Sequence, residues 1–571
     1  MELSTSRPRV LGWLRSAAIL DGDWGTSIAY VLGIAFFLGG YNSGLHLIMM
    51  VVFTMVVALN YVTICRLYPS GGGVYSAVSH RSRNLAVIGA LLLSADYVVT
   101  VSLSVLESCH YLGLAHPDIW AIGIILCIGV VNWFGPRHAG SLAIIISSFT
   151  LSCLITLVAF SLPAATSDIS IAPAPGGPVE NWRMFVGIIL SISGIEAISN
   201  MTGVMKDPIK SSRRAILSVF TKISIATLVL GFAMLALPEL SRTEHKEEMI
   251  RYLGEVYVGH WFGPIIGVAF GFLLISAGST AINALVSIQF LMAGDGELPR
   301  PLQRLNKYGV PIIPLIVATL VPSVVLVFVH DVITLAHLYA IGVVGAIFIN
   351  IASTGSDRSL SIPLWTRIFM MCSATVLLLV EVTIAVEKHD ALIFALGIMA
   401  VGLTARQLSK RKVIMPVPVP IPVAIPAGLA PRAAVPTFTT RMMVAVRGGG
   451  ERLLRQACED AKLRNAFLFV LSVKQVAVSG LLPDRVSAES FEKSDWMIKT
   501  CEEYGIAYKV ISILSPEVGY TIAEQAATFA VDRLVLGATQ RNLVETALRG
   551  DVIRIVSELL PEEIQLIIYR S

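Results

Sequence analysis

The chain has 571 residues, of which 55% are hydrophobic and only 14% are charged. Soluble domains usually carry about a quarter of charged residues, so this composition indicates an integral membrane protein. The net charge of +4 and the aromatic content of 8% provide no strongly basic surface, which excludes nucleic acid as a partner.

Apolar runs of about 20 residues predict twelve membrane spans in a lipid bilayer. The runs lie at 17–41, 44–66, 86–112, 119–135, 139–162, 184–204, 215–237, 261–293, 312–329, 331–351, 363–385 and 389–406. No short apolar region before the first run ends in a small-residue cleavage site, so this run is expected to be a span and not a removed signal.

The distribution of Lys and Arg predicts the orientation of these spans. With a cytoplasmic N-terminus, the inside segments hold 19 of these residues and the outside segments hold five. This bias predicts a multi-pass protein of the cell (inner) membrane with both termini cytoplasmic. The longest outside segment contains 241–257, whose mixed charges favour a solvated surface helix.

A change of composition marks a second domain after the spans. Residues 1–412 are predicted to form the membrane domain, and the regularly spaced prolines of 413–436 favour a semi-rigid linker. In 437–571, β-branched runs alternate with helical stretches, which predicts a cytoplasmic α/β doubly wound domain. The predicted strands are 442–447, 466–473, 507–514, 532–538 and 564–570.

The seven cysteines show neither C-x-x-C nor Cys/His spacing, so no zinc site or disulfide framework is predicted and no cofactor is expected. They are interpreted as small buried apolar residues.

Ionisable residues inside spans are expensive, about 2.5–3.5 kcal/mol each on insertion scales, and are candidates for function. Asp21 and Asp23 lie early in the first span, where Gly22 and Gly25 interrupt the apolar helix. Such breaks at membrane depth line cavities in secondary transporters. We expect Asp21 to cap the helix at the cytoplasmic surface and Asp23 to face the cavity.

Three further spans carry polar residues at helical spacing. In the third span, Asp96, Thr100 and Ser104 form one stripe with Tyr97 beside it. The sixth span contains Ser193 and Glu196 on one face, with Gly194 allowing the backbone to open, and the tenth contains Tyr339. Hydroxyl side chains in membrane helices often donate to carbonyl groups of their own helix, so hydroxyls alone are weak evidence for a binding site. Here the hydroxyls share a helix face with carboxylates, and this alignment favours a site.

The candidate set is made of oxygen ligands only, without an intramembrane Lys or Arg to neutralise it, and therefore predicts binding of a cation. A buried carboxylate favours its protonated form, so at least one is expected to bind a proton near neutral pH. The same set of carboxylates can then bind both the cation and the proton.

These residues carry a resemblance to a known group of proteins. YPSGGGVYSAVSH at 68–80, DYVVT in the third span and GIEAISN in the sixth resemble the amino acid–polyamine–organocation superfamily. More narrowly, the chain resembles its KimA-type potassium-uptake permeases, which pair an all-α twelve-span core with LeuT-like inverted repeats and a cytoplasmic α/β tail.

The resemblance assigns site residues by motif. The family's Asp seven residues before a Tyr corresponds to Asp23 and Tyr30, although the proline that commonly follows the Asp is missing. The sixth span has Ser193 in place of the usual Thr. The implied potassium-binding residues are Asp23, Tyr30, Asp96, Tyr97, Thr100, Ser104, Ser193, Glu196 and Tyr339. Asp23 and Glu196 are assigned to proton coupling, with Asp23 favoured as the carrier, and no catalytic residue or resident metal is expected.

The tail resembles the universal stress protein fold. Gly537 and Gly550 fit the nucleotide-binding loop of that family, but Gln540 replaces a Gly and Asp551 replaces a hydroxyl residue. A carboxylate at a helix N-terminus opposes phosphate, so ATP binding is not expected. The resemblance implies a homodimer through the tail, with a signalling nucleotide at its seam as a separate hypothesis.

The leading function is secondary active import of potassium by proton symport, and no enzyme activity is expected. The alternative is an amino acid or polyamine permease. Acidic residues in the first span repel a substrate carboxylate, whereas Tyr30, Tyr97 and Tyr339 suit the methylenes of a polyamine. A third hypothesis, a membrane sensor that signals through its tail, predicts no flux in vesicles.

Overall fold

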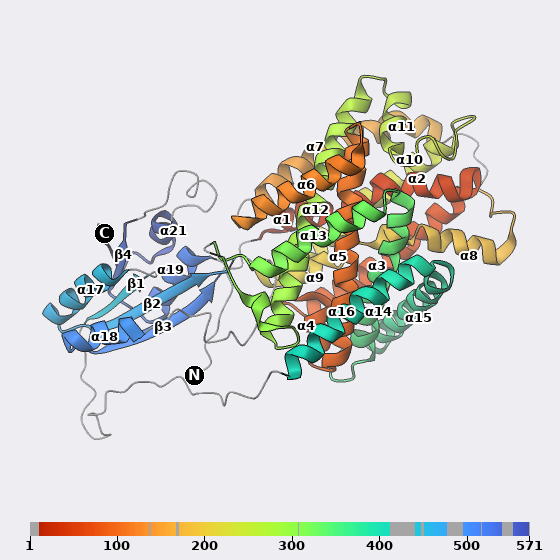
Figure 1. Cartoon of the computed structure of the whole chain (residues 1–571). Helices are drawn as coiled ribbons and strands as arrows, with labels where there is room; N and C mark the ends of the chain where they lie inside the picture. Colours follow the sequence, from red (N-terminus) through yellow and green to blue (C-terminus); the bar gives the residue numbers. More distant parts are fainter. Residues whose placement is uncertain are drawn as a thin grey trace.

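The computed structural model describes residues 11–135, 139–166, 171–306, 308–411, 440–446, 450–476, 495–515, 517–538 and 552–569. A helical part occupies 11–411, and a parallel sheet with its own helices follows within 440–569 (Figure 1). The predicted linker 413–436 lies outside the described residues.

The helical part is a sequence of long helices and short interruptions. Its α-helices are α1 Trp13–Asp21, α2 Ser27–Gly39, α3 Ser43–Leu67, α4 Gly73–Ser79, α5 Arg83–Tyr111, α6 Pro117–Trp133, α7 Ala139–Ala165, α8 Gly177–Gly187, α9 Ala197–Met201, α10 Pro208–Leu235, α11 Met249–Tyr257, α12 Phe262–Gly294, α13 Ile312–Phe328, α14 Val332–Ser356, α15 Leu364–Glu387 and α16 His389–Arg411. Its 3-10 turns are η1 Trp24–Thr26, η2 Gly40–Asn42, η3 Ile189–Ile192, η4 Thr202–Val204 and η5 Arg300–Gln303.

These helices confirm a multi-pass helical membrane protein. Within the described residues, eight helices are long and apolar enough to cross a membrane, or up to nine if one bent pair counts as a span. The apolar helices α6 and α13 are shorter. The exact number of twelve spans stays a prediction. Two predicted spans, 17–41 and 184–204, are not continuous helices, because α1 is separated from α2 and α8 from α9.

Helix α5 lies at the centre of the bundle, where it packs against α12 and α14 (Figure 1). In its most apolar stretch 89% of the residues are buried, which distinguishes it from the lipid-facing helices at the edge. A helix that is buried on every side places its polar residues inside the protein, so Asp96 and its neighbours cannot be surface groups.

The segment 241–257, which is predicted to lie outside, differs from the prediction of a solvated helix. Only 249–257 forms a helix, α11, and its residues Met249, Ile250 and Leu253 are buried. The apolar side chains recur at helical spacing on one face, so α11 packs on α2, α7 and α12 and only its other face is polar.

Two cysteines also differ from the prediction. Cys127 on α6 and Cys372 on α15 are exposed in the chain, whereas the other five are buried. These two lie on apolar helices at the edge of the bundle, where burial in lipid replaces burial in protein.

The C-terminal part is a five-stranded parallel sheet in the order β3-β2-β1-β4-β5. Its elements are β1 Arg441–Val446, α17 Glu451–Leu463, β2 Phe467–Gln475, α18 Asp495–Tyr504, β3 Tyr508–Ser515, α19 Val518–Thr528, β4 Arg533–Gly537, α21 Val552–Leu559 and β5 Gln565–Tyr569. One core contains α17 and α18 on one face, and a second contains α19 and α21 on the other. The predicted doubly wound fold is therefore confirmed. Both ends of each predicted strand lie within two residues of the ends of an observed strand.

Candidate functional site

Two broken helices form the centre of the candidate site. Between α1 and α2 the chain leaves the helix at Gly22 and Asp23 and passes through η1. Between α8 and α9 it passes through η3, and Ser193 is extended with φ −67° and ψ 152°. The two halves of this second helix are bent by 43°. Unwound backbone leaves amide and carbonyl groups free to face a ligand.

Gly194 brings the two breaks into direct contact. Its φ of +89° is a left-handed conformation, and a Cβ atom there would lie 2.7 Å from the Cα of Trp24. The Trp24 indole also donates to the carbonyl of Ser191, with 3.3 Å between Nε1 and O. Only glycine fits at this crossing, so residue 194 fixes the distance between Asp23 on one break and Glu196 on the other.

Three carboxylates share this region. The charges of Asp23 and Glu196 act on each other, and both act on Asp96 of α5. Glu196 Oε2 accepts from the backbone amide of Gly194 at 3.1 Å. Asp96 Oδ1 accepts from Thr100 Oγ1 at 3.2 Å, while its Oδ2 has no hydrogen-bond partner in the described part of the chain. The site therefore concentrates negative charge that protein donors satisfy only in part.

Hydroxyl groups complete the site from three helices. Tyr339 of α14 donates to Ser193 Oγ, and the phenol of Tyr30 on α2 interacts with that of Tyr339. Thr100 donates to the carbonyl of Asp96 at 2.9 Å as well as to its side chain. The Thr100 hydroxyl thus shows the local back-bonding that the sequence allowed, together with a contact to the carboxylate.

All nine predicted site residues are buried. They are Asp23, Tyr30, Asp96, Tyr97, Thr100, Ser104, Ser193, Glu196 and Tyr339. The structure brings most of them together, whereas Ser104 lies two turns beyond Asp96 on α5. Within the described ranges, no group of three or more His, Cys, Asp and Glu side chains is placed to hold a metal ion. A cation here would be held by one or two carboxylates with hydroxyl and carbonyl oxygens.

Asp21 has a different environment from the one predicted. It is 3% exposed and does not lie at the surface. Lys222 of α10 forms an ion pair with it, and Ser147 of α7 donates to Asp21 Oδ2 at 2.5 Å. The membrane part therefore does contain a lysine, and the expectation of an oxygen-only set without an intramembrane cation is wrong in this respect. Lys222 neutralises Asp21, because Asp21 is the carboxylate within its reach.

The glycine run at 71–73 supports the second broken helix. All three glycines have positive φ, of +85°, +97° and +58°. This conformation lets the turn before α4 pack against Asn200 and Gly203. Asn200 in turn donates to the Tyr97 hydroxyl at 3.1 Å. The motif that indicated the superfamily thus holds the end of the broken helix beside Tyr97.

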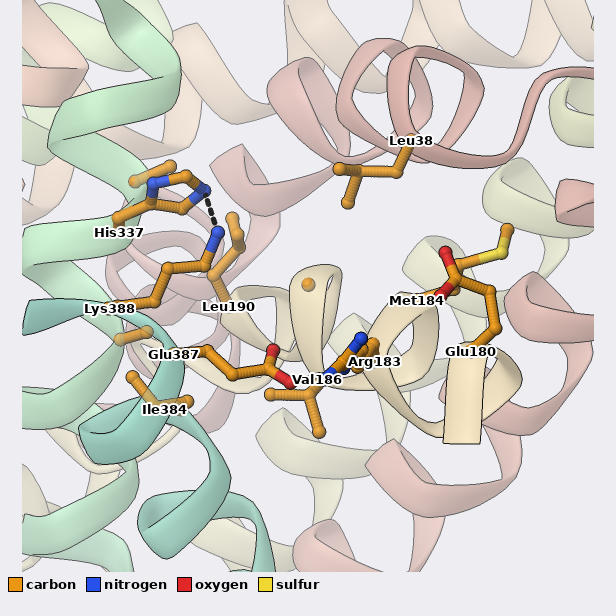
Figure 2. Close-up of a pocket in the computed structure, with 13 residues that line it drawn as sticks. Leu38, Glu180, Arg183, Met184, Val186, Leu190, His337, Ile384, Glu387 and Lys388 are labelled. Carbon is orange, nitrogen blue, oxygen red and sulfur yellow. Dashed lines mark hydrogen bonds and ion pairs between the residues drawn. The ribbon is translucent and has the colours of Figure 1, made fainter. Parts of the chain in front are cut away.

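A cavity of about 140 Å³ lies beside the site between α2, α8 and α14 (Figure 2). Leu190 of η3 and residues on either side of Tyr339 line it, so it reaches the second break. Lys388 Nζ donates to His337 Nε2 at 2.9 Å, and Arg183 Nε lies 2.5 Å from Glu387 Oε1. Burial lowers the pKa of Lys388, which lies between α15 and α16. On the predicted topology this cavity opens to the outside.

Several functional partners were not found from the sequence. Lys222 was missed although a lysine inside an apolar run is itself a signal. Asn200 and Ser147 gave no signal, because isolated amides and hydroxyls are frequent in membrane helices. Glu107 is a buried carboxylate and Glu381 a half-buried one, each with unpartnered oxygen in the described part of the chain, and their positions in apolar runs could have identified them.

A family model described as amino acid permease matches residues 11–379. The chain belongs to the amino acid permease family. This membership confirms the resemblance to the amino acid–polyamine–organocation superfamily. The KimA-type specificity stays a prediction.

Over 248 residues the chain is 23% identical to the lysine-specific permease LysP of Escherichia coli (strain K12), covering 38% of this chain and 49% of that protein. The chain thus spans about half the length of this curated relative. A solved universal stress protein in complex with cAMP is 16% identical, covering 24% of this chain and 98% of that one, with a TM-score of 0.20.

Proposed function

We propose that the protein imports potassium by proton symport through the site at the two broken helices. The observation that carries the proposal is the set of three interacting, buried carboxylates, Asp23, Asp96 and Glu196. In the described part of the chain no Lys, Arg or His forms an ion pair with any of these three carboxylates. The intramembrane Lys222 is paired with Asp21 instead. A bound cation supplies the missing positive charge.

The size and chemistry of the site support a small cation. Carboxylate, hydroxyl and unwound backbone oxygens are the ligands that hard cations prefer. Tyr339, Ser193 and Thr100 already direct hydroxyls to this region. The membrane potential contributes about 2.3 kcal/mol per charge per 100 mV to inward movement, and a co-transported proton adds a second charge.

Proton coupling follows from the same charges. Three mutually repelling carboxylates cannot all be ionised without a counter-charge, so at least one carries a proton when a single potassium ion is bound. We assign this role to Asp23 and Glu196, with Asp23 as the carrier, since it lies on the unwound segment that continues α1 from the predicted cytoplasmic side.

Transport of an amino acid or a polyamine is the second candidate, and the family membership together with the lysine-specific relative favours it. An ammonium group would suit the three carboxylates as well as potassium does. The carboxylate of an amino acid substrate, however, would have to bind the backbone amides at the first break, where the charge of Asp23 would repel it.

The deciding experiment is uptake into proteoliposomes of the purified full-length protein under an imposed proton gradient. Potassium, putrescine, lysine and a panel of neutral amino acids are compared at equal concentration, with protein-free vesicles as control. Uptake of potassium, with inward proton movement that depends on it, is the expected result. Uptake of lysine or putrescine without potassium would assign the site to an organic cation.

A further inference from the structure

Glu107 on α5 is a buried carboxylate that the proposed site does not use. It lies one turn before α5 ends at Tyr111 and is 0% exposed. Neither of its carboxylate oxygens has a hydrogen-bond partner within the described residues. On the predicted topology this end of α5 faces the outside, beyond Asp96 along the same helix.

A loop packs on the end of α5 that carries Glu107. This outer loop, residues 238–261, connects α10 to α12 and contains α11. It is attached to the end of α5 by two contacts. His110 Nδ1 lies 3.2 Å from Glu247 Oε2, and Arg251 Nη1 lies 3.5 Å from the carbonyl oxygen of Tyr111.

The basic groups of the outer loop next to Glu107 form ion pairs with other acidic residues and not with Glu107. Lys246 Nζ lies 3.2 Å from Asp331 and 3.7 Å from Glu247, and it also lies over the ring of Phe37. Arg251 pairs with Glu248 at 3.1 Å and with Glu255 at 3.4 Å. Each described basic side chain around Glu107 therefore already has an acidic partner.

The charges that act on Glu107 are predominantly negative. From the outer loop, Glu247 and Glu248 repel its ionised form and Lys246 attracts it. Tyr111 on α5 and Tyr30 on α2 are the phenols that face it, and the Tyr111 hydroxyl donates to the carbonyl of Ala29 at 2.8 Å. The charge of Glu107 thus interacts both with the outer loop and with Tyr30 of the candidate site.

An ionised carboxylate in this position would be a buried charge without an ion-pair or hydrogen-bond partner, which is strongly unfavourable. The neutral carboxylic acid avoids this cost. When the outer loop is lifted, water can solvate the carboxylate and the repulsion by Glu247 and Glu248 disappears. Closure of the loop and protonation of Glu107 therefore favour each other by linkage.

We propose that Glu107 is an outer proton-binding site whose protonation permits the outer loop to close over the transport pathway. The inference deepens the proposed proton symport, on which it rests for the use of this proton in transport. One proton from the outside solution binds a carboxylate oxygen of Glu107, and no other bond changes. Low outside pH then favours the closed loop, and rising pH favours the open one.

Hydrogen–deuterium exchange of the full-length protein in lipid nanodiscs without substrate tests the linkage directly. Exchange of 238–261 is measured between pH 5.5 and 8 and corrected for the intrinsic pH dependence of amide exchange. In the wild type, protection of the loop should fall by up to about tenfold per pH unit once Glu107 ionises, since one proton is linked. Glu107→Gln should remain protected throughout, and Glu107→Asp should keep the pH dependence.

Glu381→Gln is the control, because Glu381 on α15 is a half-buried carboxylate with one unpartnered oxygen among the described residues but does not lie under the outer loop. It should behave as the wild type. Equal pH dependence in the wild type and Glu107→Gln, or none in the wild type, would overturn the proposal.

The exchange measurement distinguishes this inference from the proposed function. Failure of potassium uptake in proteoliposomes with a normal pH-dependent loop would reject the potassium assignment and support the proton site. Potassium uptake by Glu107→Gln with the same dependence on outside pH as the wild type would reject the proton site and leave the potassium assignment intact.

Discussion

Asp21 and Asp23 lie two residues apart at the first break, yet they belong to two different environments. Asp21 is 3% exposed and Asp23 is 6% exposed, so burial does not distinguish them. Asp21 is paired with Lys222 and Ser147, which we call the paired cluster. Asp23, by contrast, is repelled by the negative charge of the Glu196 carboxylate.

Charge compensation, more than burial, distinguishes the two carboxylates, because Asp21 has a cationic partner and Asp23 has no ion-pair partner among the described residues. The paired cluster ties α1 to α7 and α10 and leaves no charge for a ligand. The candidate site retains negative charge that a moving cation can use. The predictions below test whether the two environments respond differently to the same kind of change.

The largest effect is expected from Asp96→Asn in the candidate site. Removal of this charge should reduce cation uptake by at least about 100-fold, which corresponds to roughly 3 kcal/mol. Thermal stability in detergent should not fall, because a buried charge without a cationic partner is removed. Near-normal uptake by a correctly inserted variant would rule out the cation site.

In the paired cluster, Lys222→Met should destabilise the protein by about 3–5 kcal/mol, since Asp21 is left as an uncompensated buried charge. The double variant Asp21→Asn/Lys222→Met should recover most of this loss. Chemical or thermal unfolding of the two variants measures the difference. A single variant as stable as the wild type would mean that the ion pair does not support the break.

Gly194→Ala tests the contact between the two breaks. A left-handed backbone and a clash with Trp24 should cost at least about 1–3 kcal/mol and displace Glu196 from Asp23. Gly123→Ala on α6 is the matched control, because a Cβ there meets nothing within 4 Å. The control should be neutral or slightly stabilising, and equal melting temperatures for both variants would contradict the crossing geometry.

A smaller and more specific effect is expected from Asp23→Asn. If Asp23 carries the coupled proton, uptake should become less dependent on outside pH than in the wild type. Initial rates between pH 5.5 and 8 measure this, with Asp21→Asn/Lys222→Met as the control that keeps Asp23 intact. An unchanged pH profile would assign the proton to another group.

The smallest effect on transport is expected from truncation after Lys412. The candidate site lies entirely in the helical part, so inward flux should remain measurable. β5 is an edge strand of the sheet, and pairing with a second copy is one way to cover such an edge. Light scattering should show a weaker homodimer after truncation, and a signalling nucleotide that inhibits the full-length chain should lose its effect.

Much of the fold could be predicted from the sequence because its signals are local. Apolar run length predicts membrane helices, as for 363–385 against the observed Leu364–Glu387. Alternating strands and helices predicted the parallel sheet. The opening of the sixth span at Gly194 was also expected. The contact between the two breaks and the pairing of Asp21 could not be predicted, since both depend on residues far apart in sequence, Gly194 with Trp24 and Asp21 with Lys222.

The candidate residues could be chosen from helical spacing, but their roles could not. Asp96 and Thr100 are one turn apart, so their hydrogen bond follows from the helix. The same reasoning gives no means of telling Asp21 from Asp23, because their difference lies on α10. The predicted nucleotide loop cannot be judged either, since Gln540, Gly550 and Asp551 lie outside the described residues.

Calorimetric titration of the purified full-length protein with potassium chloride tests the central claim most directly, with choline chloride as the control salt. The account predicts saturable potassium binding to the wild type and to Asp21→Asn/Lys222→Met, and its loss in Asp96→Asn. Absence of binding to the wild type, or binding that Asp96→Asn leaves unchanged, would contradict the claim that the unpaired carboxylates hold the transported cation.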